Sequence, residues 1–255
     1  MILPGDERGS GAALVLLHAG VADRRMWADL LDPLAGAGAR VFAPDLPGFG
    51  EAEPSPAPPW QDVLDTIDAL EIERFVLAGN SFGALVAKRV ALLAPERVAG
   101  LAMISPSPEE ELPSSELLAV WEAEEAALES EDLDAAVAIA VDAWTLPHAP
   151  AAQRELVAQM QRRAYEVALE GNEPCYEPDP VAEHPEALAR LELPVLITYG
   201  EHDMPDFARI ATALEATMPR ARLEVIAGAG HLAPLERPDV VIELLAGLLD
   251  EALPA

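Results

Sequence analysis

The strongest chemical signal in the sequence is a serine between two glycines. Gly79, Ser81 and Gly83 form a GxSxG pattern that follows the apolar run 75–78 and precedes the helical pattern 84–93. A serine on a sharp turn from strand to helix needs a strained backbone, and the residues two before and two after it approach neighbouring backbone too closely for a side chain. The pattern therefore predicts a nucleophilic serine at the start of a helix, whose positive dipole end favours charge developing on an attacked carbonyl oxygen. An incidental tight turn is the alternative.

The chain also offers a base and an acid for that serine. A serine hydroxyl is a poor nucleophile unless a base is close by and a third group holds the base. Asp203 follows the predicted strand 194–199, and His231 lies in a glycine-rich loop after the predicted strand 222–226. Open α/β sheets place their chemistry at the carboxyl ends of the strands. The order Ser81, Asp203, His231 therefore predicts acyl transfer by a serine nucleophile.

Short apolar runs alternate with longer helical patterns along the chain, which is typical of a parallel sheet with helices on both faces. We expect six parallel strands, at residues 13–17, 39–43, 74–78, 100–104, 194–199 and 222–226. The helices expected between and after them cover residues 26–35, 59–70, 82–93, 206–217 and 238–249. The predicted fold class is α/β, with a mostly parallel central sheet flanked by helices.

The gap between the fourth and fifth predicted strands is too long for a simple crossover. It holds amphipathic patterns of its own at residues 114–129, 132–144 and 151–170. We therefore expect residues 106–192 to form a helical cap inserted into a core made of residues 1–105 and 193–255. Trp144 ends an apolar helix of this cap and is the best candidate for a residue of the substrate pocket, although packing inside the cap is the commoner role for such a side chain.

Composition excludes several partners and cofactors. The 16 Lys and Arg residues against 45 Asp and Glu give a net charge of −29, which repels nucleic acid and anionic membranes. A single cysteine, Cys175, rules out an internal disulfide and favours a reducing cytoplasm. The apolar run 12–22 has no basic leader before it, and no run reaches the ~18 residues of a membrane helix, so we expect an untargeted cytoplasmic chain. No histidine pair has metal-ligand spacing and no GxGxxG joins a strand to a helix, so neither a metal nor a nucleotide cofactor is expected.

Together these motifs resemble the α/β-hydrolase superfamily over nearly the whole chain. The segments that carry the resemblance, besides the serine turn, are Leu-His-Ala-Gly at 17–20, Asp-Leu-Pro-Gly-Phe-Gly at 45–50, Gly-Glu-His-Asp at 200–203, and Gly-His at 230–231 followed by Glu-Arg-Pro at 236–238. The resemblance implies Ser81 as nucleophile, His231 as general base and acid, and Asp203 as the carboxylate that orients the histidine. It also implies an oxyanion hole made by the backbone N–H groups of Gly20 and Phe82.

The sequence departs from the pattern of this superfamily in three places. Ala19 and Glu51 stand where members usually have glycine and serine. Members also begin with an antiparallel strand pair, and only about eleven residues precede Ala12 here. We therefore expect the sheet to be shortened at this edge, and whether the strand pair is missing stays open.

Three other carboxylates compete with Asp203 for the role of the acid. Asp206 lies three residues further along and is expected to cap the next helix. Glu109 and Glu110 follow the fourth strand, where some members of the superfamily keep their acid. We favour Asp203 because it directly follows a glycine turn at a strand end. His18 is interpreted as a structural residue that supports the oxyanion loop.

The resemblance implies a serine hydrolase that cleaves a carboxylic ester or a related acyl bond of a small molecule through an acyl-enzyme intermediate. The sequence leaves open whether the protein is a monomer or a homodimer. The same triad also serves lactonases, thioesterases, carbon–carbon bond hydrolases and perhydrolases, and a ligand-binding relative without catalysis is the alternative from another class. Serine at position 81 argues against the haloalkane dehalogenases and epoxide hydrolases of the superfamily, which have a carboxylate there. The sequence of the cap does not distinguish among the remaining activities.

Overall fold

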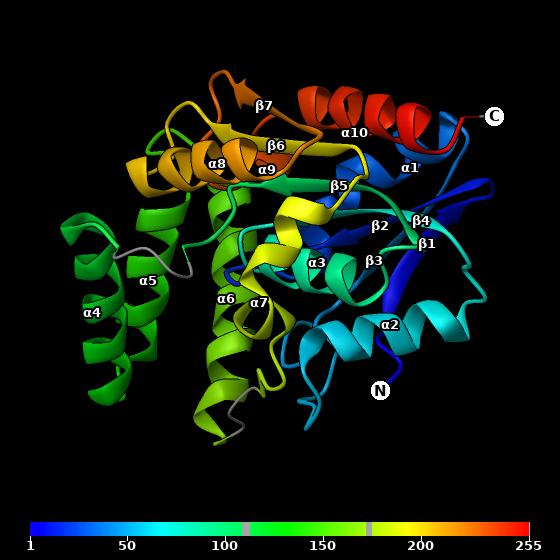
Figure 1. The fold of residues 1–255 in the computed structure, drawn as a ribbon. Coiled ribbons are helices and arrows are strands. Elements are labelled where there is room, and N and C mark those ends of the chain that lie inside the picture. The colour runs from blue at the N-terminus through cyan, green and yellow to red at the C-terminus, as the bar shows by residue number, and fades with distance from the viewer. Residues whose placement is uncertain (109–112, 172–174, 255) are drawn as a thin grey trace.

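The computed structural model describes residues 1–108, 113–171 and 175–254. Within these residues, seven strands form one sheet in the order β1-β3-β2-β4-β5-β6-β7 (Figure 1). Their bounds are β1 Gly5–Gly9, β2 Ala12–Leu17, β3 Ala39–Pro44, β4 Phe75–Asn80, β5 Val98–Ile104, β6 Val195–Gly200 and β7 Ala221–Ile226. All neighbouring strands are parallel except β1 and β3. The predicted α/β fold with a mostly parallel sheet is confirmed.

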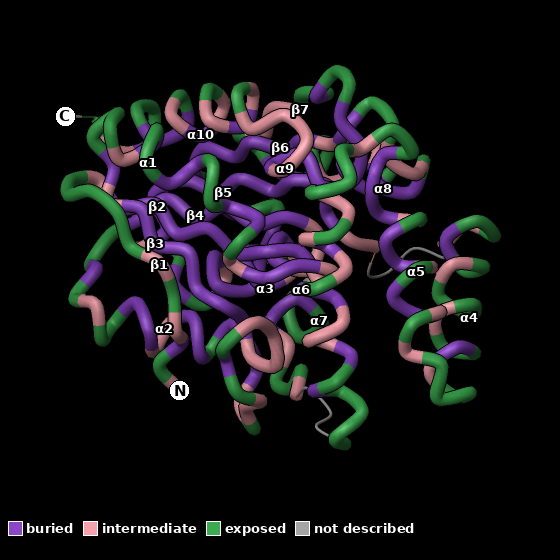
Figure 2. Tube along the Cα trace, turned by 180° about the vertical axis from the view of Figure 1, so that it is seen from behind, coloured by how far each residue is buried: buried purple, intermediate pink, exposed green. Residues whose placement is uncertain are grey.

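Helices cover both faces of this sheet. Residues of α1 and α10 pack into the apolar core on one face, and residues of α2, α3 and α8 pack into the core on the other face (Figure 1). The helices that flank the sheet are α1 Ala28–Gly36, α2 Pro59–Ala69, α3 Phe82–Leu93, α8 Pro205–Thr217, α9 Ala233–Glu236 and α10 Pro238–Ala252, and a short 3₁₀ helix, Arg24–Trp27, leads into α1. Burial on both faces explains why the central strands are almost continuously apolar rather than alternating. Figure 2 shows these strands buried between helices with exposed outer surfaces.

The first strand, β1, was not foreseen from the sequence. It pairs antiparallel with β3, in a register that places Gly5 opposite Pro44 and Gly9 opposite Arg40. Its sequence, Gly-Asp-Glu-Arg-Gly, is polar and mostly exposed, because an edge strand is held by backbone pairing and carries charges that discourage further pairing. One antiparallel strand therefore precedes β2 in the described part of the chain, at the edge where the sequence left open whether a strand pair is missing.

A group of helices separates β5 from β6 along the chain. They are α4 Ser115–Glu129, α5 Leu133–Trp144, α6 Ala151–Leu169 and α7 Pro180–Glu183, followed by a 3₁₀ helix, Pro185–Arg190. Helix α4 packs on α5 and α5 on α6, to one side of the sheet (Figure 1). Among the described residues, no helix is both long and apolar enough to cross a membrane.

Candidate active site

Ser81 occupies the turn between β4 and α3 with the strained backbone that the sequence predicts. Its φ and ψ are 54° and −112°, a conformation that non-glycine residues adopt rarely and that clusters at functional sites. The Ser81 N–H donates to the carbonyl of Ile104 at 2.9 Å, which ties the turn to the neighbouring strand β5. The serine therefore precedes the first residue of α3, at the positive end of a twelve-residue helix.

The two glycines of this turn allow a close approach of backbones. A Cβ built on Gly79 would overlap the backbone of Gly83, and one built on Gly83 would overlap the carbonyl oxygens of Leu17 and His18. The turn thus presses against its own helix on one side and against the end of β2 on the other. A side chain at either position would push the serine away from the strand ends.

His231 and Asp203 form a buried hydrogen-bonded pair beyond the ends of β7 and β6. His231 Nδ1 lies 3.1 and 3.2 Å from the two carboxylate oxygens of Asp203, and the two side chains are 5% and 1% exposed. The Met204 N–H also donates to the Asp203 carboxylate, at 2.9 Å. A carboxylate that accepts from Nδ1–H fixes the tautomer in which Nε2 is the free base.

Aromatic rings hold the His231 imidazole from two elements. The ring of Phe207, from α8, lies 4.3 Å from the imidazole between centroids, and the ring of Trp144, at the end of α5, lies 4.6 Å from it. The Trp144 indole N–H donates to Glu124 on α4 at 3.2 Å, and the Tyr165 hydroxyl donates to the same carboxylate at 2.9 Å. The inserted helices therefore reach the histidine through Trp144, and Glu124 fixes the orientation of the indole.

Two residues to which the sequence analysis gave no role of their own, Asn80 and Glu236, hold the histidine loop. The Asn80 side-chain amide donates to the carbonyl of His231 at 3.2 Å and to that of Ile104 at 3.1 Å. The Gly230 N–H donates to Glu236 at 2.6 Å, and burial raises the pKa of this carboxyl above its ordinary value. Asn80 immediately precedes Ser81, so it connects the serine turn with the histidine loop.

The hydroxyl of Ser81 hydrogen-bonds to Ser107 in this structure. The two Oγ atoms are 3.3 Å apart, and within the described residues Ser81 makes no hydrogen bond to His231. A rotation about χ1 of Ser81 between staggered rotamers redirects its hydroxyl without moving the backbone. Ser107, in the segment after β5, was not predicted as part of the site.

The loop after β2 faces the start of α3. A Cβ built on Gly20 would lie 3.4 Å from Cβ of Phe82, and the N–H of Phe82, the first residue of α3, has no acceptor within the helix. His18 is buried, accepts from the Leu46 N–H through Nε2 at 2.9 Å and hydrogen-bonds to the carbonyl of Ala19 at 2.9 Å. Because Nε2 accepts a hydrogen bond, His18 is a neutral support of this loop, and burial lowers its pKa.

Of the rival carboxylates, Asp206 lies within the described residues and makes no hydrogen bond there to His231. Asp206 does not cap α8 through its side chain, contrary to the expectation; its buried carboxylate accepts from the backbone N–H of Ser114 at 2.9 Å and from the Ser114 hydroxyl at 2.6 Å. It therefore fastens the start of α4 to the start of α8. Glu109 and Glu110 lie outside the described residues.

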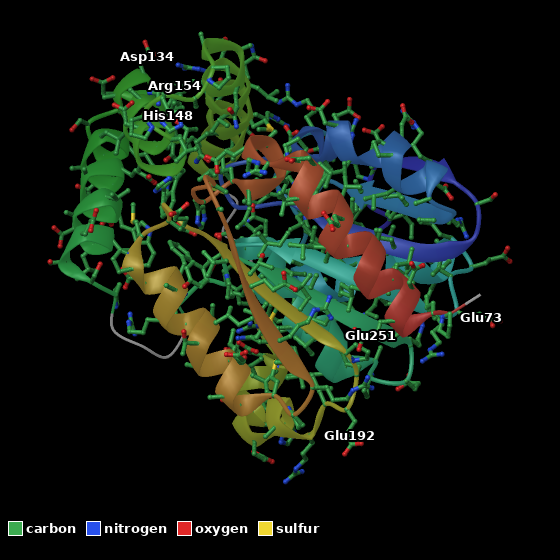
Figure 3. All side chains as sticks on the ribbon, turned by 90° about the horizontal axis from the view of Figure 1, so that it is seen from above. Glu73, Asp134, His148, Arg154, Glu192 and Glu251 are labelled. Atoms are coloured by element: carbon green, nitrogen blue, oxygen red, sulfur yellow. The ribbon has the colours of Figure 1, made fainter. Side chains whose placement is uncertain are left out.

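The remaining histidines are exposed. His202 is 51% exposed beside Glu201, and His184 precedes the 3₁₀ helix Pro185–Arg190. His148, after α5, lies with Arg154 and Asp134 at the end of the molecule that holds the inserted helices (Figure 3). Among the described residues, no cluster of His, Cys, Asp and Glu could hold a metal ion.

Two cavities adjoin these residues on different sides. One, of about 510 Å³, is lined by Asp203, His231 and Trp144 together with exposed polar side chains. Ser81 and Phe82 are not among its walls, so it lies on the Asp203 side of the histidine. The other, of about 120 Å³, is lined by Phe82 and lies beside the serine turn.

Comparisons with known proteins agree with this architecture. A sequence model described as "Alpha/beta hydrolase family" matches residues 14–244. The chain is 28% identical over 249 residues to pimeloyl-[acyl-carrier protein] methyl ester esterase of Yersinia pseudotuberculosis, with 93% of each chain covered. It is 38% identical over 106 residues to 2-hydroxymuconate semialdehyde hydrolase of Pseudomonas sp. (strain CF600), which covers 38% of each. A thermophilic esterase from Thermogutta terrifontis superposes with a TM-score of 0.79 at 25% identity, over 98% of this chain and 93% of that one.

Proposed function

Because the chain belongs to the alpha/beta hydrolase family, we propose that it cleaves a carboxylic ester through a triad of Ser81, His231 and Asp203. Relatives named as esterases and hydrolases over most of its length make it a hydrolase enzyme. The observation that carries the proposal is a strained serine at the positive end of α3, whose chain neighbour Asn80 bonds to the loop of a buried histidine–carboxylate pair. Asn80 supports it further, since its side chain reaches the His231 carbonyl while its backbone continues into the serine.

In the proposed reaction, the Ser81 hydroxyl turns from Ser107 toward Nε2 of His231. The serine oxygen attacks the ester carbonyl carbon as the proton passes to the imidazole, and Asp203 stabilises the imidazolium that forms. The N–H groups of Gly20 and Phe82 donate to the oxyanion, each contributing about 3 kcal/mol of transition-state stabilisation.

Collapse of the tetrahedral intermediate transfers the same proton to the alcohol oxygen, which leaves. Water then attacks the acyl-serine with His231 as the base, which releases the carboxylic acid and restores the serine hydroxyl. No cofactor enters either half of the reaction.

We propose that residues 106–192 act as a cap over this site. The contact between Trp144 and the imidazole supports that role, as does the bond that Asp206 makes to the start of α4. Trp144 is then a wall of the site on the side of the histidine.

The test is hydrolysis of a short-chain aryl ester, combined with labelling by a fluorophosphonate probe. Ser81→Ala should abolish both, while Ser130→Ala, at the exposed residue directly after α4, should change neither. Urea unfolding of both variants should match that of the wild type. If Ser81→Ala stays folded and retains turnover, Ser81 is not the nucleophile.

A further inference from the structure

The cavity beside Phe82 is small and mainly apolar. Its walls come from the loop after β3, the start of α3, α6 and the segment that contains Tyr176. Its apolar walls include Phe49, Phe82, Ala164, Val167 and Tyr176. Among the described residues that line it, none is charged.

Aromatic contacts hold the wall of this cavity in place. The Phe49 ring lies between those of His18 and Phe82, with centroid distances of 5.0 and 5.8 Å. Tyr176 meets the edge of Phe82 at 6.4 Å and stacks on Trp60 at 6.4 Å. Since His18 also supports the oxyanion loop, the cavity wall and this loop form one packed unit.

The chemistry of the triad decides which part of an ester enters this cavity. The leaving oxygen must receive its proton from His231, so the alcohol part lies on the histidine side of the carbonyl carbon. The oxyanion points to the Phe82 N–H, and the acyl chain extends away from the histidine. The cavity that Phe82 lines is therefore on the acyl side.

Resting on the function proposed above, we infer that this cavity binds the acyl chain, and that the substrate is an ester of a short, uncharged acid of about four carbons. A cavity of about 150 Å³ accommodates a benzene ring, and a water molecule occupies about 30 Å³. The volume of about 120 Å³ is thus filled by about four carbon-sized groups. A second carboxylate on the chain would be buried without a partner, which is strongly unfavourable.

The first measurement is kcat/KM for p-nitrophenyl esters of acids with two to ten carbons. Burial of one methylene contributes about 0.8 kcal/mol, so kcat/KM should rise about fourfold for each added carbon that the cavity holds. The rise should stop at about four carbons. A half-ester of a dicarboxylic acid of four carbons should react at least tenfold more slowly than the four-carbon monoacid ester.

Two variants change the size of the cavity. Val167→Ala removes two methyl groups from a buried wall residue and should move the preferred chain to about six carbons. Ala164→Leu fills the cavity and should move the preference to the two-carbon ester. The matched control is Val157→Ala, which makes the same change at a buried position of the same helix outside the cavity and should leave the ratio of four- to eight-carbon activity unchanged.

The outcomes separate this inference from the proposed function. If Ser81→Ala abolishes ester hydrolysis but activity keeps rising through eight carbons, or neither wall variant shifts the preference, the assignment of the acyl cavity is wrong while the triad stands. If no ester is hydrolysed, or if Ser81→Ala retains activity, the proposed function fails and this inference fails with it.

Discussion

Replacement of Asp203 by asparagine tests the proposed mechanism most directly. The substitution keeps the size and shape of a side chain that is 1% exposed, and removes its negative charge. Asp203 contacts the histidine rather than any residue of the serine turn. Asp203→Asn should therefore lower kcat strongly and leave KM nearly unchanged.

The structure sets the size of this loss. With Nδ1–O distances of 3.1 and 3.2 Å, an imidazolium and the carboxylate have their charges about 4 Å apart. At an effective dielectric constant of about 20, two unit charges at that separation attract by about 4 kcal/mol. This energy corresponds to about a thousandfold in rate. The asparagine amide also stabilises the tautomer with the proton on Nε2, which extends the loss toward about 10⁴-fold.

Glu236→Gln provides the matched control, because it is the same kind of change at a second carboxylate near His231, one that is partly buried. Glu236 holds the Gly230 N–H, and glutamine keeps an acceptor for that bond, so the loss in kcat should stay below about tenfold. Initial rates with an aryl ester and urea unfolding of both variants give the comparison. Equal losses in the two variants at equal stability would refute the assignment of Asp203.

Three further predictions concern the supports of the site. Gly83→Ala should lower the free energy of unfolding in urea by more than about 3 kcal/mol, since its Cβ would overlap the carbonyl of Leu17. The control is Gly247→Ala in α10, where a Cβ meets nothing within 4 Å. This variant should raise the free energy of unfolding by about 0.5–1 kcal/mol. Ser107→Ala should leave kcat/KM unchanged or raise it up to about fivefold, because one neutral hydrogen bond contributes about 1 kcal/mol; a tenfold drop would contradict this. Burial lowers the pKa of His18, so below about pH 6.5 the unfolded chain binds more protons than the folded protein does. The free energy of unfolding should therefore fall as the pH drops. Compared with the His18→Gln variant, the wild type should lose up to about 1.4 kcal/mol more per pH unit. Equal slopes in urea unfolding between pH 7.5 and 5.5 would contradict the neutral buried imidazole.

The central elements could be predicted from the sequence because local patterns and burial agree there. The helix predicted at 82–93 is observed as Phe82–Leu93, and that predicted at 151–170 as Ala151–Leu169. Strand β1 could not be predicted, since Asp6 to Arg8 carry no apolar periodicity and the strand exists through pairing with β3. The helix predicted at 26–35 begins with a 3₁₀ turn that the pattern does not distinguish.

The partners of site residues were harder to predict than the residues themselves. Asp206 has the sequence position of a helix cap, yet it binds Ser114, 92 residues away. Ser107 and Glu124 carry no motif, and their roles follow from the hydroxyl and the indole that they meet in space. A sequence motif predicts where the local backbone must make a tight turn, as it does at Gly83. Hydrogen bonds between distant elements depend instead on how those elements pack.

The strand ends combine into two tightly packed units. The serine turn presses on the end of β2 because Gly83 has no side chain, and in the same way the acid turn presses on the histidine loop because a Cβ on Gly200 would overlap the carbonyl of Gly230. The Ser81 turn thus packs as one unit with the end of β2, and the Asp203 turn as another with the His231 loop. Asn80 is the described side chain that joins them, through its bonds to Ile104 and His231. The placement of Ser81 relative to His231 therefore depends on how these two units pack against each other, and Asn80 bonds to the histidine side of that packing.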